Sequence, residues 1–178
     1  MRNFWVFGYG SLMWNPGFDA ASRRSAVLYG AHRALCVHSW VHRGTQETPG
    51  LVLGLDRGGS CRGVAFEVAG RDSENVLAYL RERELVTHVY LETRRMVRFD
   101  NGERQEALAY VVDRSHEQYA GRMGDEKIAA IVRRGVGRSG ANIDYVANTL
   151  AHLREEGIHD PHLEAVAHYL DPAPKRSG

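Results

Sequence analysis

The sequence is short of the features that assign a chain to a specialised class. Only two of its 178 residues are cysteines, Cys36 and Cys61, so a disulfide framework is not expected. Positive charges exceed negative ones by a single unit, and lysine and arginine form no stripe. Apolar runs stay far below the roughly 20 residues that cross a bilayer. These absences argue against nucleic acid and membranes as partners.

Export and metal signals are also lacking. The opening "NFWVFGYG" is too short and too interrupted by glycine for the apolar core of a signal peptide, so we expect a cytoplasmic location with both thiols reduced and buried. Zinc-binding patterns such as Cys-x-x-Cys or His-Glu-x-x-His do not occur, and no metal is expected. The length favours a single domain over residues 1–170, followed by a flexible tail at residues 171–178.

The pattern that is present favours strands first and helices later. Segments rich in aromatic and β-branched residues predict strands at roughly 4–7, 26–42, 51–55 and 61–68. A helix is predicted from about residue 72, and two further strands follow, joined by a tight turn at residues 100–102. Two helices and a shorter one after Pro161 complete the chain. This order predicts an α+β fold, a small and mostly antiparallel β-barrel with flanking helices.

The first candidate site is the glycine loop in "FWVFGYGSLMW", residues 4–14. It is not a dinucleotide fingerprint, because Met13 stands where a third glycine is required. Two interpretations are open: backbone N–H groups form a nest for a carboxylate or an oxyanion, or the glycines merely reverse the chain. The other glycine motif, "GVGRSG" at residues 135–140, follows a helix and is expected to be a helix-to-helix turn.

The second candidate is an acid on the apolar face of a predicted helix. In "NVLAYLRERE", Glu84 falls between Leu77 and Leu80 at about 100° per residue, whereas Glu82 faces away. A carboxylate placed there is desolvated, so its pKa rises and it becomes a better general base near neutral pH. The alternative is that the helix ends by Arg83 and that "RERE" is a solvated surface.

Two weaker candidates concern histidine and cysteine. His38 and His42 have the spacing of a helical metal pair, but "HSWVH" is predicted to be a strand, where this spacing means only the same face. Cys36 paired with a histidine would be a nucleophile, although a cysteine in the middle of a strand is more often inert core.

These motifs, in their order, resemble the ChaC-like γ-glutamylcyclotransferases from about Trp5 to about Val166. The similar segments are "WVFGYGSLMWNPGF", "HRGTQETPG", "CRGVAFEV", "RERELVTHVY" and "GRSGANIDY". One departure is Glu82, which stands where the family often has an aromatic residue.

The resemblance implies an enzyme that cleaves glutathione, a small-molecule substrate, to 5-oxoproline and cysteinylglycine without a cofactor. Glu84 aligns with the family's catalytic glutamate, which acts as general acid and base. The residues expected to bind substrate are Gly8, Tyr9, Gly10, Ser11, Leu12 and Met13, with weaker contributions from Arg43 and Tyr145. Two alternatives stay open: a cyclotransferase for other γ-glutamyl amides or amines, and a non-catalytic γ-glutamyl-binding module.

Overall fold

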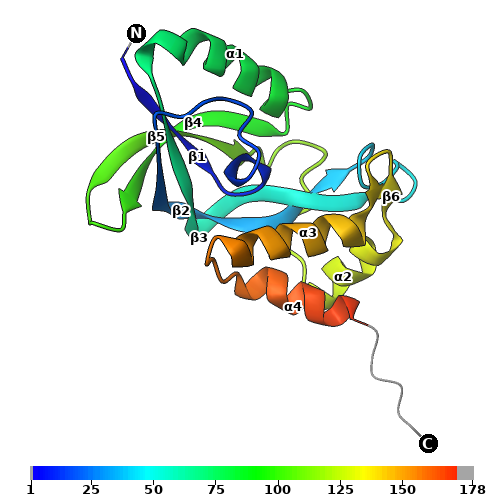
Figure 1. Ribbon diagram of the computed structural model, residues 1–178. Helices are drawn as coiled ribbons and strands as arrows, with labels where there is room; N and C mark the ends of the chain where they lie inside the picture. The colour runs from blue at the N-terminus through cyan, green and yellow to red at the C-terminus, as the bar shows by residue number, and fades with distance from the viewer. Residues whose placement is uncertain (1, 172–178) are drawn as a thin grey trace, which may run out of the picture. The chain divides into compact units, whose positions relative to one another are not determined.

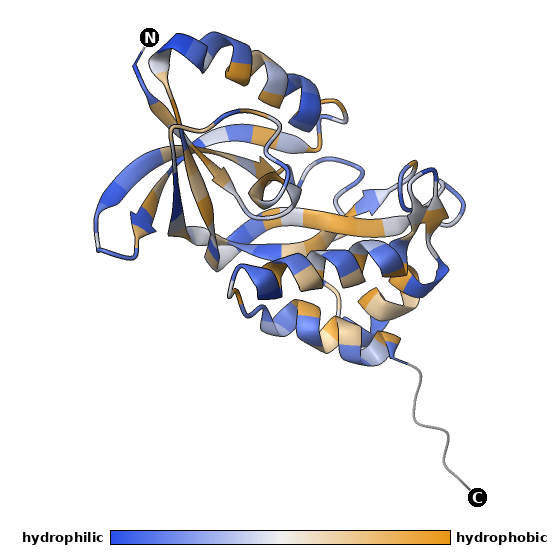
Figure 2. Cartoon of the chain, viewed as in Figure 1, coloured by the Kyte–Doolittle hydropathy of each residue, from blue (hydrophilic) through white to orange (hydrophobic). Residues whose placement is uncertain are grey.

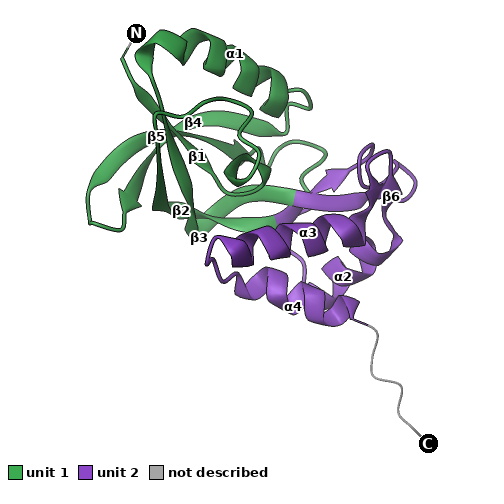
Figure 3. Cartoon of the chain, in the orientation of Figure 1, with its two compact units in different colours: residues 1–34, 53–119 green, residues 35–52, 120–178 purple. Residues whose placement is uncertain are grey.

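The computed structural model describes residues 2–171, so most of the predicted tail lies outside the described residues. The chain divides into two compact units, coloured separately in Figure 3. The first comprises Met1–Ala34 and Leu53–Tyr119, and the second comprises Leu35–Val52 and Ala120–Gly178. The expectation of one domain over residues 1–170 stays a prediction.

Five strands close into a barrel in the order β1-β3-β2-β4-β5 (Figure 1). Their bounds are β1 (Phe4–Gly8), β2 (Ser22–Ser39), β3 (Gly50–Val68), β4 (Tyr90–Phe99) and β5 (Arg104–Val112). β1 pairs antiparallel with β3 and parallel with β5, whereas β4 pairs antiparallel with both β2 and β5. The predicted α+β class with a small, mostly antiparallel barrel is confirmed.

The long strand β3 contains glycines that the sequence pattern predicts to be a break between two strands. The prediction of separate strands at residues 51–55 and 61–68 is wrong, because β3 continues through Gly58 and Gly59. Both have positive φ, 101° and 71°, a conformation that glycine adopts without steric cost and that bends a strand without ending it. β2 ends at Ser39, three residues short of the prediction, so His42 does not share a strand with His38.

Side chains of the barrel divide between two apolar clusters, as the alternation along strands requires. The inner cluster takes residues from all five strands, among them Phe7, Leu28, Leu55, Val97 and Val111. The outer cluster lies between the barrel wall and helix α1 (Ser73–Glu84), which follows the 3₁₀ turn η2 (Gly70–Asp72). It contains Val6, Leu12, Val68, Val76, Leu80, Leu108 and Tyr110.

The second unit holds three helices, α2 (Asp125–Arg134), α3 (Asn142–Glu155) and α4 (Pro161–Leu170), which pack against one another. Hydrophobic and hydrophilic residues share each of α1, α3 and α4 in Figure 2, as in amphipathic helices. Asp160 caps α4 by accepting the Leu163 N–H at 3.0 Å.

The segment between α2 and α3 differs from expectation. It is a small hairpin of β6 (Val136–Gly137) and β7 (Gly140–Ala141), where a simple turn was predicted. Within residues 2–171, the helices are too short or too polar to span a membrane.

We predict that Leu80→Ala lowers the free energy of unfolding by about 2–5 kcal/mol, because Leu80 is fully buried between α1 and the barrel. Chemical denaturation followed by circular dichroism measures the change. Val86→Ala is the control, since Val86 is 70% exposed and its truncation removes little packing. Equal losses in the two variants would contradict the packing of α1 described here.

Candidate active site

Glu84 is the last residue of α1, and its side chain faces the barrel. Ser73, Val76 and Leu80 are the buried residues of this helix, and Glu84 continues their spacing. Only 18% of its side chain is exposed, whereas Glu82 is exposed. Burial raises the pKa of the Glu84 carboxyl, and the positive charge of Arg83 opposes part of that rise. The expectation that the helix extends to Glu84 and turns it inward is confirmed.

The glycine loop begins at the end of β1 and forms the 3₁₀ turn η1 (Ser11–Met13). A Cβ on Gly8 would lie 3.1 Å from the Leu12 Cβ, because the turn folds back on the strand. Gly10 has φ −136° and ψ −130°, outside the regions that residues with a Cβ prefer. The Met13 N–H donates to the Gly10 carbonyl at 2.9 Å. A side chain at Gly8 would therefore be crowded by the turn that follows it.

Arg83 joins the loop to the helix. Its Nη2 donates to the Ser11 Oγ at 3.0 Å, and its Nη1 donates to the Asn15 carbonyl at 2.6 Å. Its Nε lies 3.2 Å from the Glu84 Oε1. One guanidinium thus connects the two predicted site elements, the glycine loop and Glu84. The alternative interpretation, in which "RERE" is a solvated surface, is wrong for Arg83, because its side chain is only 20% exposed.

A second arginine anchors the loop from the barrel side. Arg33 on β2 is 5% exposed, and its Nε donates to the Tyr9 carbonyl at 2.6 Å. Its Nη2 donates to the Arg62 carbonyl of β3 at 2.7 Å. Sequence reasoning missed this residue. The available signal was an arginine directly before the apolar strand sequence "ALCV", where a buried charge requires hydrogen-bond partners.

A polar network lies beside Glu84 on β4 and β5. Arg81 donates to both carboxylate oxygens of Glu92, at 2.9 and 2.8 Å. The Tyr110 hydroxyl donates to the Glu92 Oε2 at 3.3 Å. Burial raises the pKa of Tyr110, and the charges of Glu92 and Glu84 add to the rise. Tyr110 is thereby kept protonated as a hydrogen-bond donor within the field of the Glu84 carboxylate.

Arg43 and Tyr145, the weaker candidates, both belong to the second unit. The Arg43 guanidinium lies 5.5 Å from the centre of the Tyr145 ring, within cation–π range, and donates to the Ala141 carbonyl at 3.2 Å. Asn142, in the same motif, is fully buried and exchanges two hydrogen bonds with the Leu51 backbone, at 2.7 and 2.8 Å. It is a structural residue that fixes the start of β3.

The remaining candidates take structural positions. Cys36 and Cys61 are buried and form no disulfide. The His42 Nδ1 lies 2.9 Å from the Ser139 Oγ. Over the described range, 2–171, no group of three or more His, Cys, Asp or Glu side chains is placed to hold a metal ion. The absence of a metal or cofactor from the reaction stays a prediction.

Comparisons of the sequence and of the fold with known proteins point to the same family. The family described as "ChaC-like protein" matches residues 4–172. A glutathione-specific γ-glutamylcyclotransferase of Escherichia coli is 34% identical, over 88% of this chain and 68% of its own. Glutathione-specific γ-glutamylcyclotransferase 1 of Danio rerio is 36% identical, over 92% and 87%. A crystal structure of a yeast γ-glutamylcyclotransferase specific to glutathione superimposes with a TM-score of 0.82 at 20% identity, over 95% and 97%.

We predict that Glu84→Gln stabilises the fold at neutral pH but not in acid. An acid whose pKa is raised by folding binds its proton more tightly in the folded state, so the wild type loses stability as the pH rises from about 4.3 through that raised pKa. Glutamine does not titrate, so the variant's advantage should grow across this window, by about 1.4 kcal/mol per unit of pKa difference.

Urea unfolding of both proteins between pH 3.5 and 7.5 measures this difference. Glu82→Gln is the matched control, because Glu82 lies on the exposed face of the same helix. A Glu84→Gln variant less stable than the wild type at pH 7.5 would show that burial does not dominate at this carboxyl.

Proposed function

Since the chain belongs to the ChaC-like protein family, we propose that it is a glutathione-specific γ-glutamylcyclotransferase, which cleaves glutathione to 5-oxoproline and cysteinylglycine. The observation that carries the proposal is the half-buried Glu84, whose pKa is raised and which Arg83 joins to the glycine loop. A carboxylate poised to exchange a proton beside a loop shaped by glycines is suited to acyl transfer.

The reaction is an internal displacement. The α-amine of the γ-glutamyl group attacks its own γ-carbonyl carbon, forming the lactam C–N bond, and the bond to the cysteinyl nitrogen breaks. Both reacting atoms belong to one molecule, so the protein aligns them by folding the substrate into the ring-forming conformation. Well-oriented internal reactions reach effective molarities on the order of 10⁵–10⁸ M.

Glu84 is the proposed general base and acid. The substrate amine is mostly ammonium at neutral pH and cannot attack until it loses a proton. Glu84 accepts that proton and returns one to the departing cysteinyl nitrogen, so the carboxylate is regenerated. A carboxyl whose pKa is raised by burial holds the proton better than an exposed one does, which suits it to both steps.

The glycine loop is the proposed holder of the γ-glutamyl group, through Gly8 to Met13. Charge develops on the carbonyl oxygen as the amine attacks, and preorganised N–H groups stabilise it. The N–H groups of Ser11 and Leu12 are the proposed donors, because they precede the first internal hydrogen bond of the turn, from Met13 to Gly10. Arg83 and Arg33 fix the loop by its hydroxyl and carbonyl oxygens.

Arg43 and Tyr145 are proposed as weaker substrate-binding candidates, because the planar fork of an arginine suits a carboxylate. We further propose a cytoplasmic location and no nucleic-acid partner. Cys36 and Cys61 form no disulfide, as is typical of proteins in a reducing compartment, and the net charge is only +1.

We predict that Glu84→Gln lowers kcat on glutathione by at least about 100-fold, because glutamine keeps the shape of the side chain but accepts no proton. Release of 5-oxoproline and cysteinylglycine is measured by chromatography, and the Glu82→Gln variant should match the wild type. A Glu84→Gln enzyme with most of its activity would place the base elsewhere.

The same assay separates the alternatives. Turnover of γ-glutamyl amines without turnover of glutathione would keep the proposed chemistry and change the substrate. Saturable binding of glutathione with no product from any γ-glutamyl compound would instead indicate a binding module.

We predict that two substitutions of Arg83 separate its two roles. Arg83→Lys keeps the charge beside Glu84 but loses the fork that reaches Ser11 and Asn15, so kcat/KM should fall about ten- to a hundredfold with little change in the pH profile. Arg83→Gln also removes the charge that lowers the Glu84 pKa. The acidic limb of its kcat/KM profile should therefore move to higher pH.

Steady-state kinetics between pH 4.5 and 9 test both variants. Arg71→Lys and Arg71→Gln are the controls, since Arg71 is highly exposed and pairs only with the neighbouring Asp72 among the contacts described. Identical pH profiles for Arg83→Gln and the wild type would contradict the electrostatic role.

A further inference from the structure

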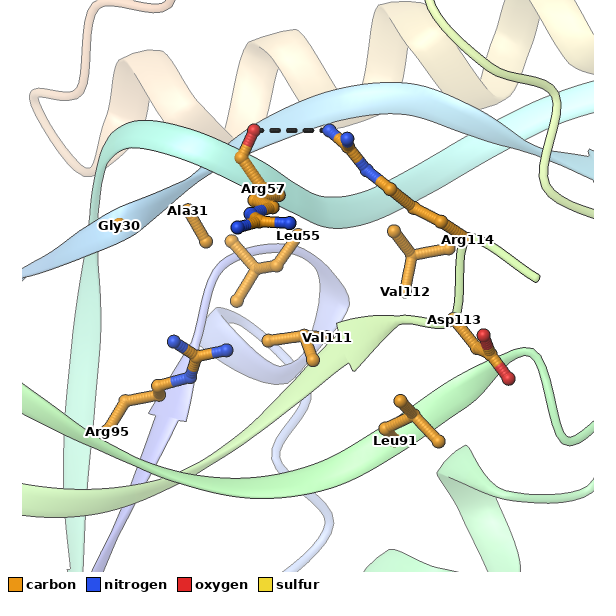
Figure 4. A pocket seen from close by; sticks show the side chains of 10 residues that line it. All are labelled: Gly30, Ala31, Leu55, Arg57, Leu91, Arg95, Val111, Val112, Asp113 and Arg114. Atoms are coloured by element: carbon orange, nitrogen blue, oxygen red, sulfur yellow. Dashed lines mark hydrogen bonds between the residues drawn. The ribbon is translucent and has the colours of Figure 1, made fainter. Parts of the chain in front are cut away.

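A cavity opens in the first unit where two strands of the barrel separate. The ladder between β2 and β4 comprises the pairs Ala26–Phe99, Val27–Arg98 and Leu28–Val97, whereas β4 and β5 stay paired as far as Tyr90 and Val112. Gly30, just beyond the end of the short ladder, has φ 87° and turns β2 away from β4. The space left between the strands is a cavity of about 430 Å³ (Figure 4).

The cavity combines an apolar floor with cationic walls. Ala31, Leu55 and Val111 form the floor and belong to the inner cluster of the barrel. Figure 4 shows the guanidinium groups of Arg57 and Arg95 close to Leu55, on the cavity side. Cavities of this size, mostly apolar with a few fixed polar groups, are typical sites for small molecules.

The acids near the cavity are already engaged. Asp56 accepts from the Arg114 Nε at 2.7 Å and from the Tyr119 hydroxyl at 2.9 Å. The Asp113 Oδ1 accepts from the Ser115 N–H at 2.9 Å and from the Ser115 hydroxyl at 2.6 Å. Asp113 points away from the arginines in Figure 4.

Within the part of the chain that the structure describes, neither of these acids pairs with Arg57 or Arg95. Among residues 2–171, neither Arg57 nor Arg95 forms an ion pair, and the Arg95 Nε makes a long hydrogen bond to the Thr93 Oγ1, at 3.4 Å. Like charges facing one cavity repel each other, and an anion between them removes the repulsion and gains charge-assisted hydrogen bonds.

We propose that this cavity is a binding site for a small organic carboxylate. The carboxylate lies between Arg57 and Arg95, and the apolar part of the ligand packs on Leu55 and Val111. The site is separate from the Glu84 region because successive residues of a strand face opposite sides: Val111 lies in the inner cluster, whereas Tyr110 lies in the outer cluster beside α1. The proposal does not depend on the proposed function.

The test is a ¹H–¹⁵N NMR titration of the full chain with three probes of graded chemistry. Cyclopentanecarboxylate carries both the charge and the apolar body, cyclopentanecarboxamide lacks the charge, and inorganic phosphate lacks the apolar body. We expect saturable shifts at Gly30, Ala31 and Val111 with the carboxylate, and at least tenfold weaker binding of the other two probes.

Variants locate the binding. Arg57→Gln and Arg95→Gln should each weaken carboxylate binding at least tenfold, and Arg98→Gln, whose arginine does not line this cavity, should leave it unchanged. The proposal would be overturned if the carboxamide or phosphate bound as tightly as the carboxylate. It would also be overturned if Arg98→Gln weakened carboxylate binding as much as Arg57→Gln and Arg95→Gln do, or if the shifts did not saturate. Glutathione turnover is assayed separately. If the protein does not cleave glutathione, the NMR titration still tests carboxylate binding at this cavity.

Discussion

The Arg83 guanidinium is the constraint on which the candidate site depends. Two elements meet there: α1, positioned by Leu80 on the outer cluster, and the glycine loop, held by the buried Arg33 and by Leu12 in the same cluster. Arg83 belongs to the helix and bonds the loop, so the position of each is fixed relative to the other. Its charge also limits the rise in the Glu84 pKa. One side chain thus acts on both the position of the loop and the proton affinity of Glu84.

Closure of the barrel by a parallel pair explains why the site lies at one end of it. β1 and β5 run in the same direction, and β4 runs against β5. The end of β1, the end of β5 and the start of β4 therefore lie at the same end of the barrel. The glycine loop follows β1, and the chain from Glu84 enters β4, so both proposed elements are delivered there by topology.

Sequence reasoning succeeded where the signal was local. The helical position of Glu84 follows from the spacing of two leucines. It failed where the partner is distant. Arg33 donates a hydrogen bond to a carbonyl 24 residues away in the sequence, and Arg83 donates one to a carbonyl 68 residues away. The periodicity of a sequence does not predict such distant partners. The sequence does not show that β3 continues through Gly58 and Gly59, because the strand pairing that sustains a bent strand is a property of the whole sheet.

Neither compact unit is a contiguous stretch of the chain. The boundaries after Ala34 and Val52 fall inside β2 and β3, so each of these strands contributes residues to both units. No single truncation can release either unit complete: removing Ala120–Gly178 leaves Leu35–Val52 behind without the helices of its own unit. The gene therefore offers no point at which recombination could exchange one unit for another, and the two must be inherited, and must change, together.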